Sequence, residues 1–114
     1  MSRSDLQRVQ DILDRADRIA KIVAEGQEQF LAEDKNFSAI ERHIEVIGES
    51  ASQLTEAAKS FYSDVEWGDI IGMRIRLAHH YFRINEKNVW GAASTNVPEL
   101  ARALRARPLP ESDN

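Results

Sequence analysis

Ten consecutive residues of this 114-residue chain gather side chains suited to acid–base chemistry and phosphate binding. Positions 72–81 read Gly-Met-Arg-Ile-Arg-Leu-Ala-His-His-Tyr and include Arg74, His79 and Tyr81. An arginine carries a permanent charge on a planar fork that matches a phosphate, and a histidine titrates near neutral pH. Together these groups could bind a phosphodiester and move a proton without a metal ion.

RNA is the phosphodiester that fits this chemistry, because its ribose 2′-hydroxyl can itself attack the adjacent phosphorus. In that reaction Arg74 would stabilise the developing negative charge, and His79 would act as general acid or base. Arg76 and His80 would be accessory residues of the same site. The alternative is that this stretch is only the solvated face of a helix.

The helical position of Arg74 favours the functional interpretation. Arg74 lies seven residues before Tyr81 and falls on an apolar stripe, where a buried, unpaired guanidinium is costly. His79 lies about 140° around the helix from Arg74, so one straight helix does not aim both groups at one point. Either the long Arg74 side chain reaches across, or a second copy of the chain completes the site across a twofold interface. The second option is the better physical account, because a twofold interface places two copies of each group in one cleft.

The elements that must position these residues are helices, because apolar residues recur at steps of three and four along most of the chain. Capping boxes predict helix starts at Ser4, Ser38 and Ser63. The second of these helices is expected to be continuous through residue 61, and the third carries the motif. The fold class is therefore all-α, an antiparallel up-and-down bundle of three long and one or two shorter helices.

Two shorter helical segments are expected after the motif. The first carries Val89 and Trp90, and the second begins near Pro98 and runs to about residue 106. Residues 1–107 are predicted to form one helical domain, and residues 108–114 a flexible C-terminal tail. Trp67 and Trp90 are expected to anchor the core or an interface. Glu49 is interpreted either as a surface residue or as a partner of Arg74 or Arg76.

Composition limits the classes of function. The chain has no cysteine, which excludes disulfides and thiolate metal sites, and its formal net charge is −4. That charge argues against a dedicated high-affinity nucleic-acid binder, although an enzyme that contacts a few phosphates remains possible. No apolar run is long enough to span a membrane, so a cytoplasmic protein is expected. We expect no cofactor and no metal site, since His43, His79 and His80 form no recognisable ligand pattern.

The Arg-x4-His-x-Tyr pattern of Arg74, His79 and Tyr81 resembles the signature of the HEPN superfamily, and specifically its HepT-like branch. Three further segments agree in order with that branch. They are Ile-Gly-Glu-Ser at positions 47–50, Trp-Gly-Asp-Ile-Ile-Gly-Met-Arg at positions 67–74, and Val-Trp with Val-Pro-Glu-Leu at positions 89–90 and 97–100. The resemblance covers nearly the whole chain, from Leu6 to Leu104.

The resemblance implies a helical homodimer in which the motifs of both chains face a shared cleft. Such proteins are metal-independent ribonucleases that act as toxins of type II toxin–antitoxin systems. Their usual partner is a minimal nucleotidyltransferase that serves as antitoxin and transfers AMP onto the motif tyrosine, here Tyr81. RNA, the nucleotidyltransferase and a second copy of the chain are thus the expected partners.

One departure from the family pattern bears on activity. The family commonly has a polar residue directly after the motif arginine, whereas this chain has Ile75. The residue between the histidine and the tyrosine is commonly glutamate, and here it is His80, which could substitute in catalysis. The alternative is therefore a weak or inactive HEPN dimer that acts as a binding partner of the nucleotidyltransferase.

Overall fold

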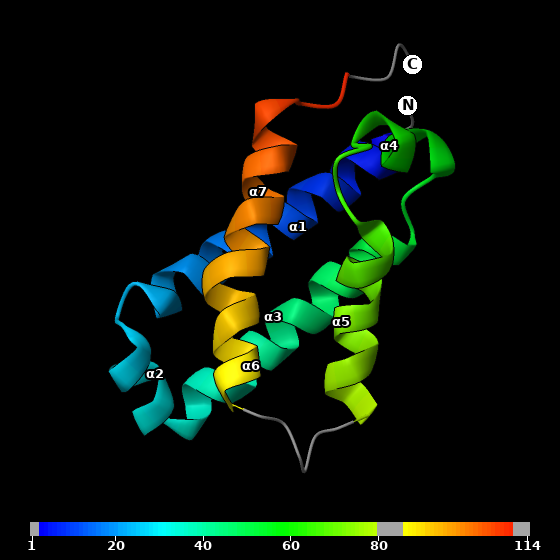
Figure 1. Cartoon of the computed structure of the whole chain (residues 1–114). Helices are drawn as coiled ribbons and strands as arrows, with labels where there is room; N and C mark the ends of the chain where they lie inside the picture. The colour runs from blue at the N-terminus through cyan, green and yellow to red at the C-terminus, as the bar shows by residue number, and fades with distance from the viewer. Residues whose placement is uncertain (1–2, 80–85, 111–114) are drawn as a thin grey trace.

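The computed structural model describes residues 3–79 and 86–110, with side chains described for residues 4–73 and 89–110. These ranges fold into helices and contain no strand, so the all-α prediction is confirmed (Figure 1). Within them, no helix is long and apolar enough to cross a lipid bilayer.

Two long helices, α1 (Arg3–Val23) and α3 (Asp34–Ser52), run antiparallel along the centre of the molecule (Figure 1). Their predicted apolar stripes meet in the core, which buries Val9, Ile12, Ala16 and Ile19 of α1 and Ile40, Ile44, Ile47 and Ala51 of α3. Each fully buried isoleucine stabilises the fold by roughly 1.5–3 kcal/mol. The short helix α2 (Gln27–Ala32) connects them and buries Phe30. Gly26 permits the turn before α2, because its φ of 95° is a conformation that other residues rarely adopt.

The other helices pack around this pair. Helix α5 (Trp67–His79) packs mainly against α3. Helix α6 (Glu86–Gly91) continues without a break through the π-helical segment η1 (Ala92–Asn96) into α7 (Val97–Ala106), and η1 and α7 pack on α1. Pro98 lies in the first turn of α7, as predicted. The two shorter segments expected after the motif are therefore parts of one helical rod.

The predicted helix starts are wrong in detail. Helix α3 begins at Asp34, which leaves Ser38 inside it, and α5 begins at Trp67 rather than near Ser63. Helix α1 is already formed at Arg3, so Ser4 also lies inside a helix. A serine followed by a glutamate or glutamine three residues later is thus compatible with a helix interior when the apolar stripe extends beyond it.

The helix expected to run through residue 61 is interrupted. Helix α3 ends at Ser52, and a separate helix, α4 (Glu56–Phe61), follows. Thr55 caps α4, because its hydroxyl accepts a hydrogen bond from the backbone N–H of Ala58 at 3.2 Å. The carboxylate of Asp5 in α1 accepts hydrogen bonds from the Thr55 backbone N–H at 3.0 Å and the Thr55 hydroxyl at 2.7 Å. The break is therefore stabilised by a residue 50 positions away in sequence.

The first residues after α7 are held against α4. The Arg107 guanidinium donates a hydrogen bond to the Phe61 carbonyl at 2.9 Å and lies 4.1 Å from the centre of the Phe61 ring. Leu109 is buried. The packed part of the chain therefore extends into the predicted tail as far as Leu109, and residues 111–114 lie outside the described residues.

Candidate functional site

The predicted catalytic residues belong to the second half of α5. Trp67 and Ile70 are buried near the start of this helix, and Arg74 follows Ile70 by four residues. Arg74 therefore occupies a position on the face of α5 that packs into the protein. Arg76 and His79 lie further along the same helix; the side chains of residues 74–79 are outside the described part of the chain.

The regular geometry of α5 separates the two catalytic candidates. The helix is unbroken from Trp67 to His79, so the positions of Arg74 and His79 are about 140° apart around its axis. One copy of α5 consequently does not place them on one face. His80 and Tyr81, the accessory and modification candidates, lie outside the described residues.

Aromatic packing fixes the start of α5. The Trp67 indole N–H donates a hydrogen bond to the Lys59 carbonyl at 3.2 Å. The Tyr62 ring meets Phe61 edge-on at 5.1 Å and Trp67 at 6.4 Å. Because an α-helix is stiff, this anchorage determines which side of α5 faces α3 in the later turns that carry Arg74 and His79.

Trp67 and Trp90 are both packed against the core, as the sequence predicts. Trp67 is 9% exposed, and the half-buried Trp90 ring lies 5.3 Å from the ring of Phe30. The Ser94 hydroxyl donates a hydrogen bond to the Trp90 carbonyl at 2.7 Å, across the start of the π-helical segment. Both indoles serve the packing of helices around the site.

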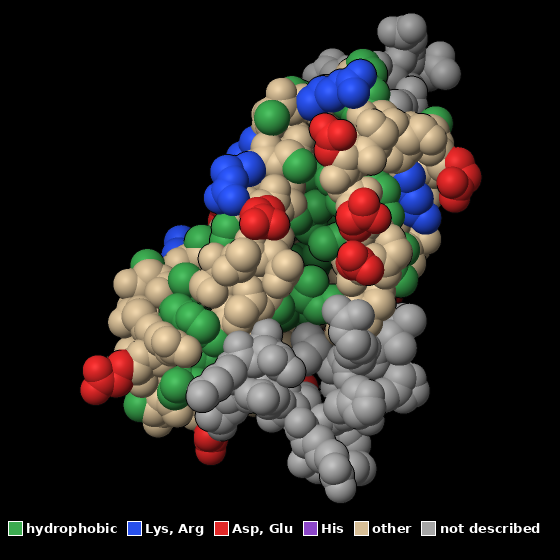
Figure 2. Space-filling model, viewed as in Figure 1, with side chains coloured by type: hydrophobic (Ala, Val, Ile, Leu, Met, Phe, Trp, Pro, Cys, Tyr) green, Lys and Arg blue, Asp and Glu red, His purple; other side chains and the backbone are tan. Residues whose placement is uncertain are grey.

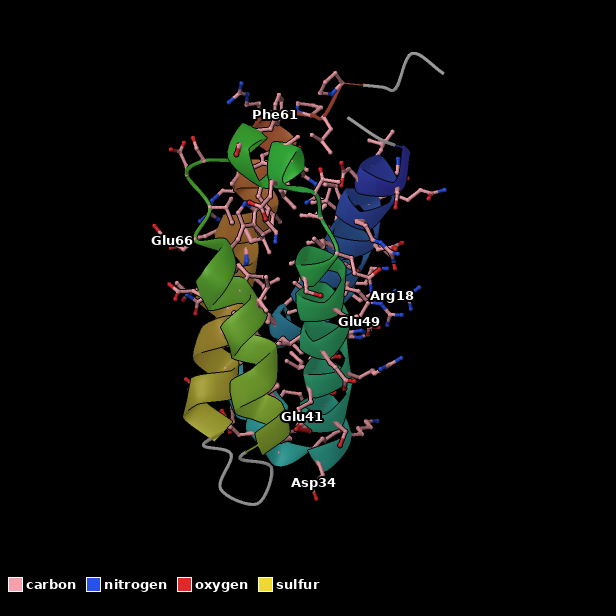
Figure 3. The ribbon with its side chains drawn as sticks, turned by 90° about the vertical axis from the view of Figure 1, so that its right-hand side faces the viewer. Arg18, Asp34, Glu41, Glu49, Phe61 and Glu66 are labelled. Carbon is pink, nitrogen blue, oxygen red and sulfur yellow. The ribbon has the colours of Figure 1, made fainter. Side chains whose placement is uncertain are left out.

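Three glutamates, Glu41, Glu45 and Glu49, follow one another at four-residue steps along α3 (Glu41 and Glu49 are labelled in Figure 3). Glu45 and Glu49 are exposed, and Glu45 pairs with Arg42 at 3.4 Å. Glu41 is half-buried, and burial together with the nearby charge of Glu45 raises its pKa above the ordinary value of a glutamate. The exposure of Glu49 favours its interpretation as a surface residue.

Glu41 lies level with the last turns of α5 in Figure 3, whereas Glu49 lies beside the middle of that helix. In the sequence, Glu41 stands three residues after Ser38 and completes the capping box predicted there, which gives it no functional role. The available signal was its place in α3, seven residues before the buried Gly48 and thus on nearly the same side of the helix.

A second polar region lies between α1 and α3. An Arg15 guanidinium nitrogen and the His43 Nδ1 atom are 3.1 Å apart, which requires His43 to accept the hydrogen bond in its neutral form. Burial and the charges of Arg15 and Arg18 lower the pKa of His43. The open groove beside it, about 870 Å³ in volume, is lined by Asp14, Asp17, Arg18, Lys21, Ile22 and His43. His43 is therefore engaged in helix packing, away from the motif of α5.

The described residues include no cluster of three or more histidine, aspartate or glutamate side chains that could hold a metal ion. The other tyrosine of the chain, Tyr62, is 4% exposed. Burial raises its pKa, and the backbone of Leu109 and the charge of Arg107 partly offset that rise. The Tyr62 hydroxyl is thus shielded from any modifying enzyme by α4 and the segment after α7.

Residues 12–107 match the family described as "Ribonuclease HepT-like". Among individual relatives, "Putative RNase TTE0752" of Caldanaerobacter subterraneus subsp. tengcongensis is 32% identical over 78 residues, covering 68% of this chain and 70% of the relative. "Probable ribonuclease HepT" of Thermococcus cleftensis is 28% identical over 101 residues, covering 88% of this chain and 92% of the relative. No solved structure is significantly similar to this chain. Since the family match spans most of its length, the chain belongs to the HepT-like ribonuclease family of the HEPN superfamily.

Proposed function

We propose that this protein is a metal-independent endoribonuclease that acts as the toxin of a type II HEPN/nucleotidyltransferase toxin–antitoxin system in the cytoplasm. The observation that carries the proposal is the position of the motif. Arg74 and His79 lie in the last turns of α5, inside the 12–107 segment that matches the ribonuclease family. The proposed substrate is RNA, and no cofactor takes part.

In the proposed reaction His79, as general base, removes the proton from a ribose 2′-hydroxyl. The 2′-oxygen attacks the adjacent phosphorus, the bond to the 5′-oxygen of the next nucleotide breaks, and that oxygen leaves with a proton from a second acid. The histidine of a second copy would supply this proton. Arg74 stabilises the charge on the phosphoryl oxygens, with Arg76 and His80 as accessory groups. The products are a 2′,3′-cyclic phosphate and a 5′-hydroxyl.

A homodimer is part of this proposal, because one helix does not bring the Arg74 and His79 positions to one face. The apolar surface beside α5 supports it. Ile71 and Met73 of α5 are only half-buried. Figure 2 shows hydrophobic atoms in the hollow between α5 and the side of the molecule formed by α7. A second copy that covers this surface would bring two motifs together.

The experiment that tests the proposal is cleavage of RNA by the purified protein in the presence of EDTA. We expect activity to persist and the fragments to end in 2′,3′-cyclic phosphate or 3′-phosphate. Light scattering should give a mass of twice 13.0 kDa at micromolar concentration. Cleavage abolished by the chelator, or a monomer with full activity, would contradict the proposed mechanism.

Tyr81 is the proposed site of neutralisation by the antitoxin. The nucleotidyltransferase would join the tyrosine oxygen to the α-phosphorus of ATP and release pyrophosphate, leaving AMP on Tyr81. The added phosphate would lie beside the arginines of α5, where charge-assisted hydrogen bonds would hold the nucleotide in the space that RNA needs. Tyr81→Phe should keep its nuclease activity after treatment with the transferase and ATP. Modification of Tyr62 instead would contradict this model, since that hydroxyl is buried.

The second candidate function is a weak or inactive HEPN dimer that binds the nucleotidyltransferase. The observation that favours it is Ile75, which stands where the family commonly has a polar residue. Ile75→Asn distinguishes the two functions. A large gain of cleavage in this variant, starting from an almost inactive wild-type protein, would favour the binding role.

A further inference from the structure

Glu41 lies on the side of α3 that faces α5. Helix α3 packs chiefly against α1 and α5, and His43 marks the side toward α1 through its contact with Arg15. Glu41 precedes His43 by two residues and is therefore about 160° around the helix from it. It shares its side, to within about 20°, with the buried Gly48. Apart from α1, the helix with the most extensive contact to α3 is α5, while α2 and α6 make smaller contacts, so α5 is the main neighbour on the Glu41 side.

The carboxyl group of Glu41 is half-buried, and none of the described residues forms a hydrogen bond or ion pair with it. The next two glutamates at four-residue steps along α3 have other surroundings, since Glu45 pairs with Arg42 and Glu49 is exposed to solvent. Burial and the Glu45 carboxylate both disfavour the charged form of Glu41, as its raised pKa indicates. A cation from the facing helix is the group that would offset both costs.

The facing helix provides such a cation at a suitable position. Arg74 occupies the inward face of α5 that begins with the buried Trp67 and Ile70. Figure 3 places Glu41 level with the last turns of that helix. An arginine on an inward face requires a partner, and its guanidinium has two usable edges, so it can bind a carboxylate with one and a phosphate with the other.

We infer that Glu41 is a positioning residue of the ribonuclease site, which holds the Arg74 guanidinium from α3 so that its free edge meets the scissile phosphate of RNA. This inference rests on the proposed function. Glu41 takes no part in bond making or breaking. It acts through Arg74, whose alignment limits the stabilisation of charge in the transition state.

The first test is the kinetics of Glu41→Gln, which removes the charge and nearly keeps the size. A positioning role predicts that kcat for RNA falls about tenfold or more with little change in KM. Glu41→Asp should recover part of the loss, and Glu49→Gln on the same helix should match the wild-type protein. If Glu41→Gln instead cleaves RNA as fast as the wild-type protein or faster, Glu41 only repels the phosphate, and the inference is wrong.

The second test does not depend on activity and measures coupling between the two residues. Thermal midpoints are compared for Glu41→Gln, Arg74→Met and the double variant, with Arg76→Met as the matched control. If Glu41 holds Arg74, the double variant loses clearly less than the sum of the single losses, whereas the pair with Arg76→Met is additive. Additive losses for Arg74→Met overturn the inference. A wild-type protein that cleaves no RNA but shows the coupling would overturn the proposed function alone.

Discussion

The two ends of α5 are built differently. Around its start, several polar groups are paired within the chain: Trp67 donates to the Lys59 carbonyl, Thr55 donates to Asp5, and Arg107 binds Phe61. Toward its last turns lies Glu41, a half-buried carboxyl group with a raised pKa and no partner among the described residues. The start of α5 therefore uses its polar groups to hold the fold, whereas the last turns carry the residues that the proposed function assigns to RNA and to a second copy of the chain.

The largest expected effect is a loss of RNA cleavage when a motif residue in the last turns of α5 is changed. His79→Ala should lower RNA cleavage about 10²- to 10⁴-fold, because general acid–base catalysis contributes about that much. Circular dichroism should show an unchanged helical fold, since the change is at one position of an already anchored helix. Initial rates on a fluorogenic RNA measure the loss. His80→Ala is the matched control and should lose less; the reverse order would make His80 the catalytic histidine.

Shortening a buried side chain tests how much the core between α1 and α3 contributes to stability. Ile44 is 1% exposed between α1 and α3, so Ile44→Ala should lower the free energy of unfolding by about 2–5 kcal/mol. Leu31 is 39% exposed, and Leu31→Ala should change it by less than about 0.5 kcal/mol. Urea denaturation gives both values. Similar losses for the two variants would contradict the described core.

Asp5 tests whether the start of the bundle depends on one buried polar contact. Its side chain is 1% exposed and accepts two hydrogen bonds from Thr55, so Asp5→Ala leaves those donors unpaired and should cost about 1–3 kcal/mol of stability. The exposed Asp11→Ala provides the baseline in the same urea titration. RNA cleavage per folded molecule should be unchanged, and a selective loss of activity would mean that the two ends are coupled.

The smallest expected effect is the pH dependence that His43 gives to the packing of α1 on α3. Its pKa is lowered in the folded protein, so the unfolded chain binds the proton more readily and acidification favours unfolding. The stability difference is absent well above pH 6.5 and grows as the pH falls through that value. It is modest because solvent screens a half-buried group. Thermal midpoints between pH 8 and pH 5 should fall less for His43→Gln; equal slopes would exclude this role.

Much of the architecture could be predicted from the sequence. Most apolar positions of the first two predicted helices are buried or half-buried, including Leu54 and Ala58, which belong to the interrupted part. The apolar period predicts the core here because it identifies the residues that are removed from water on folding, and this burial is the main favourable contribution to folding. The motif segment and its resemblance to HepT-like proteins could also be recognised from the sequence, and the family match confirms that resemblance.

The boundaries of the helices could not be predicted in the same way. Ser38 and Ser63 have the spacing of helix caps, yet Ser38 lies inside α3 and α5 starts after Ser63. The break between α3 and α4 is held by Asp5, and the packed length after α7 is set by Phe61 and its neighbours. These contacts join residues that are distant in sequence, so local patterns carry no record of them.

The sequence alone determined the all-α class, the positions of the core and the set of groups able to do chemistry, because each depends on residue type and helical period. Only the tertiary structure decided which side of α3 faces α5, and so distinguished the half-buried Glu41 from the exposed Glu45 and Glu49. The three glutamates have the same side chain and regular spacing. Their difference in solvation arises from the neighbouring helix, which the local sequence does not specify.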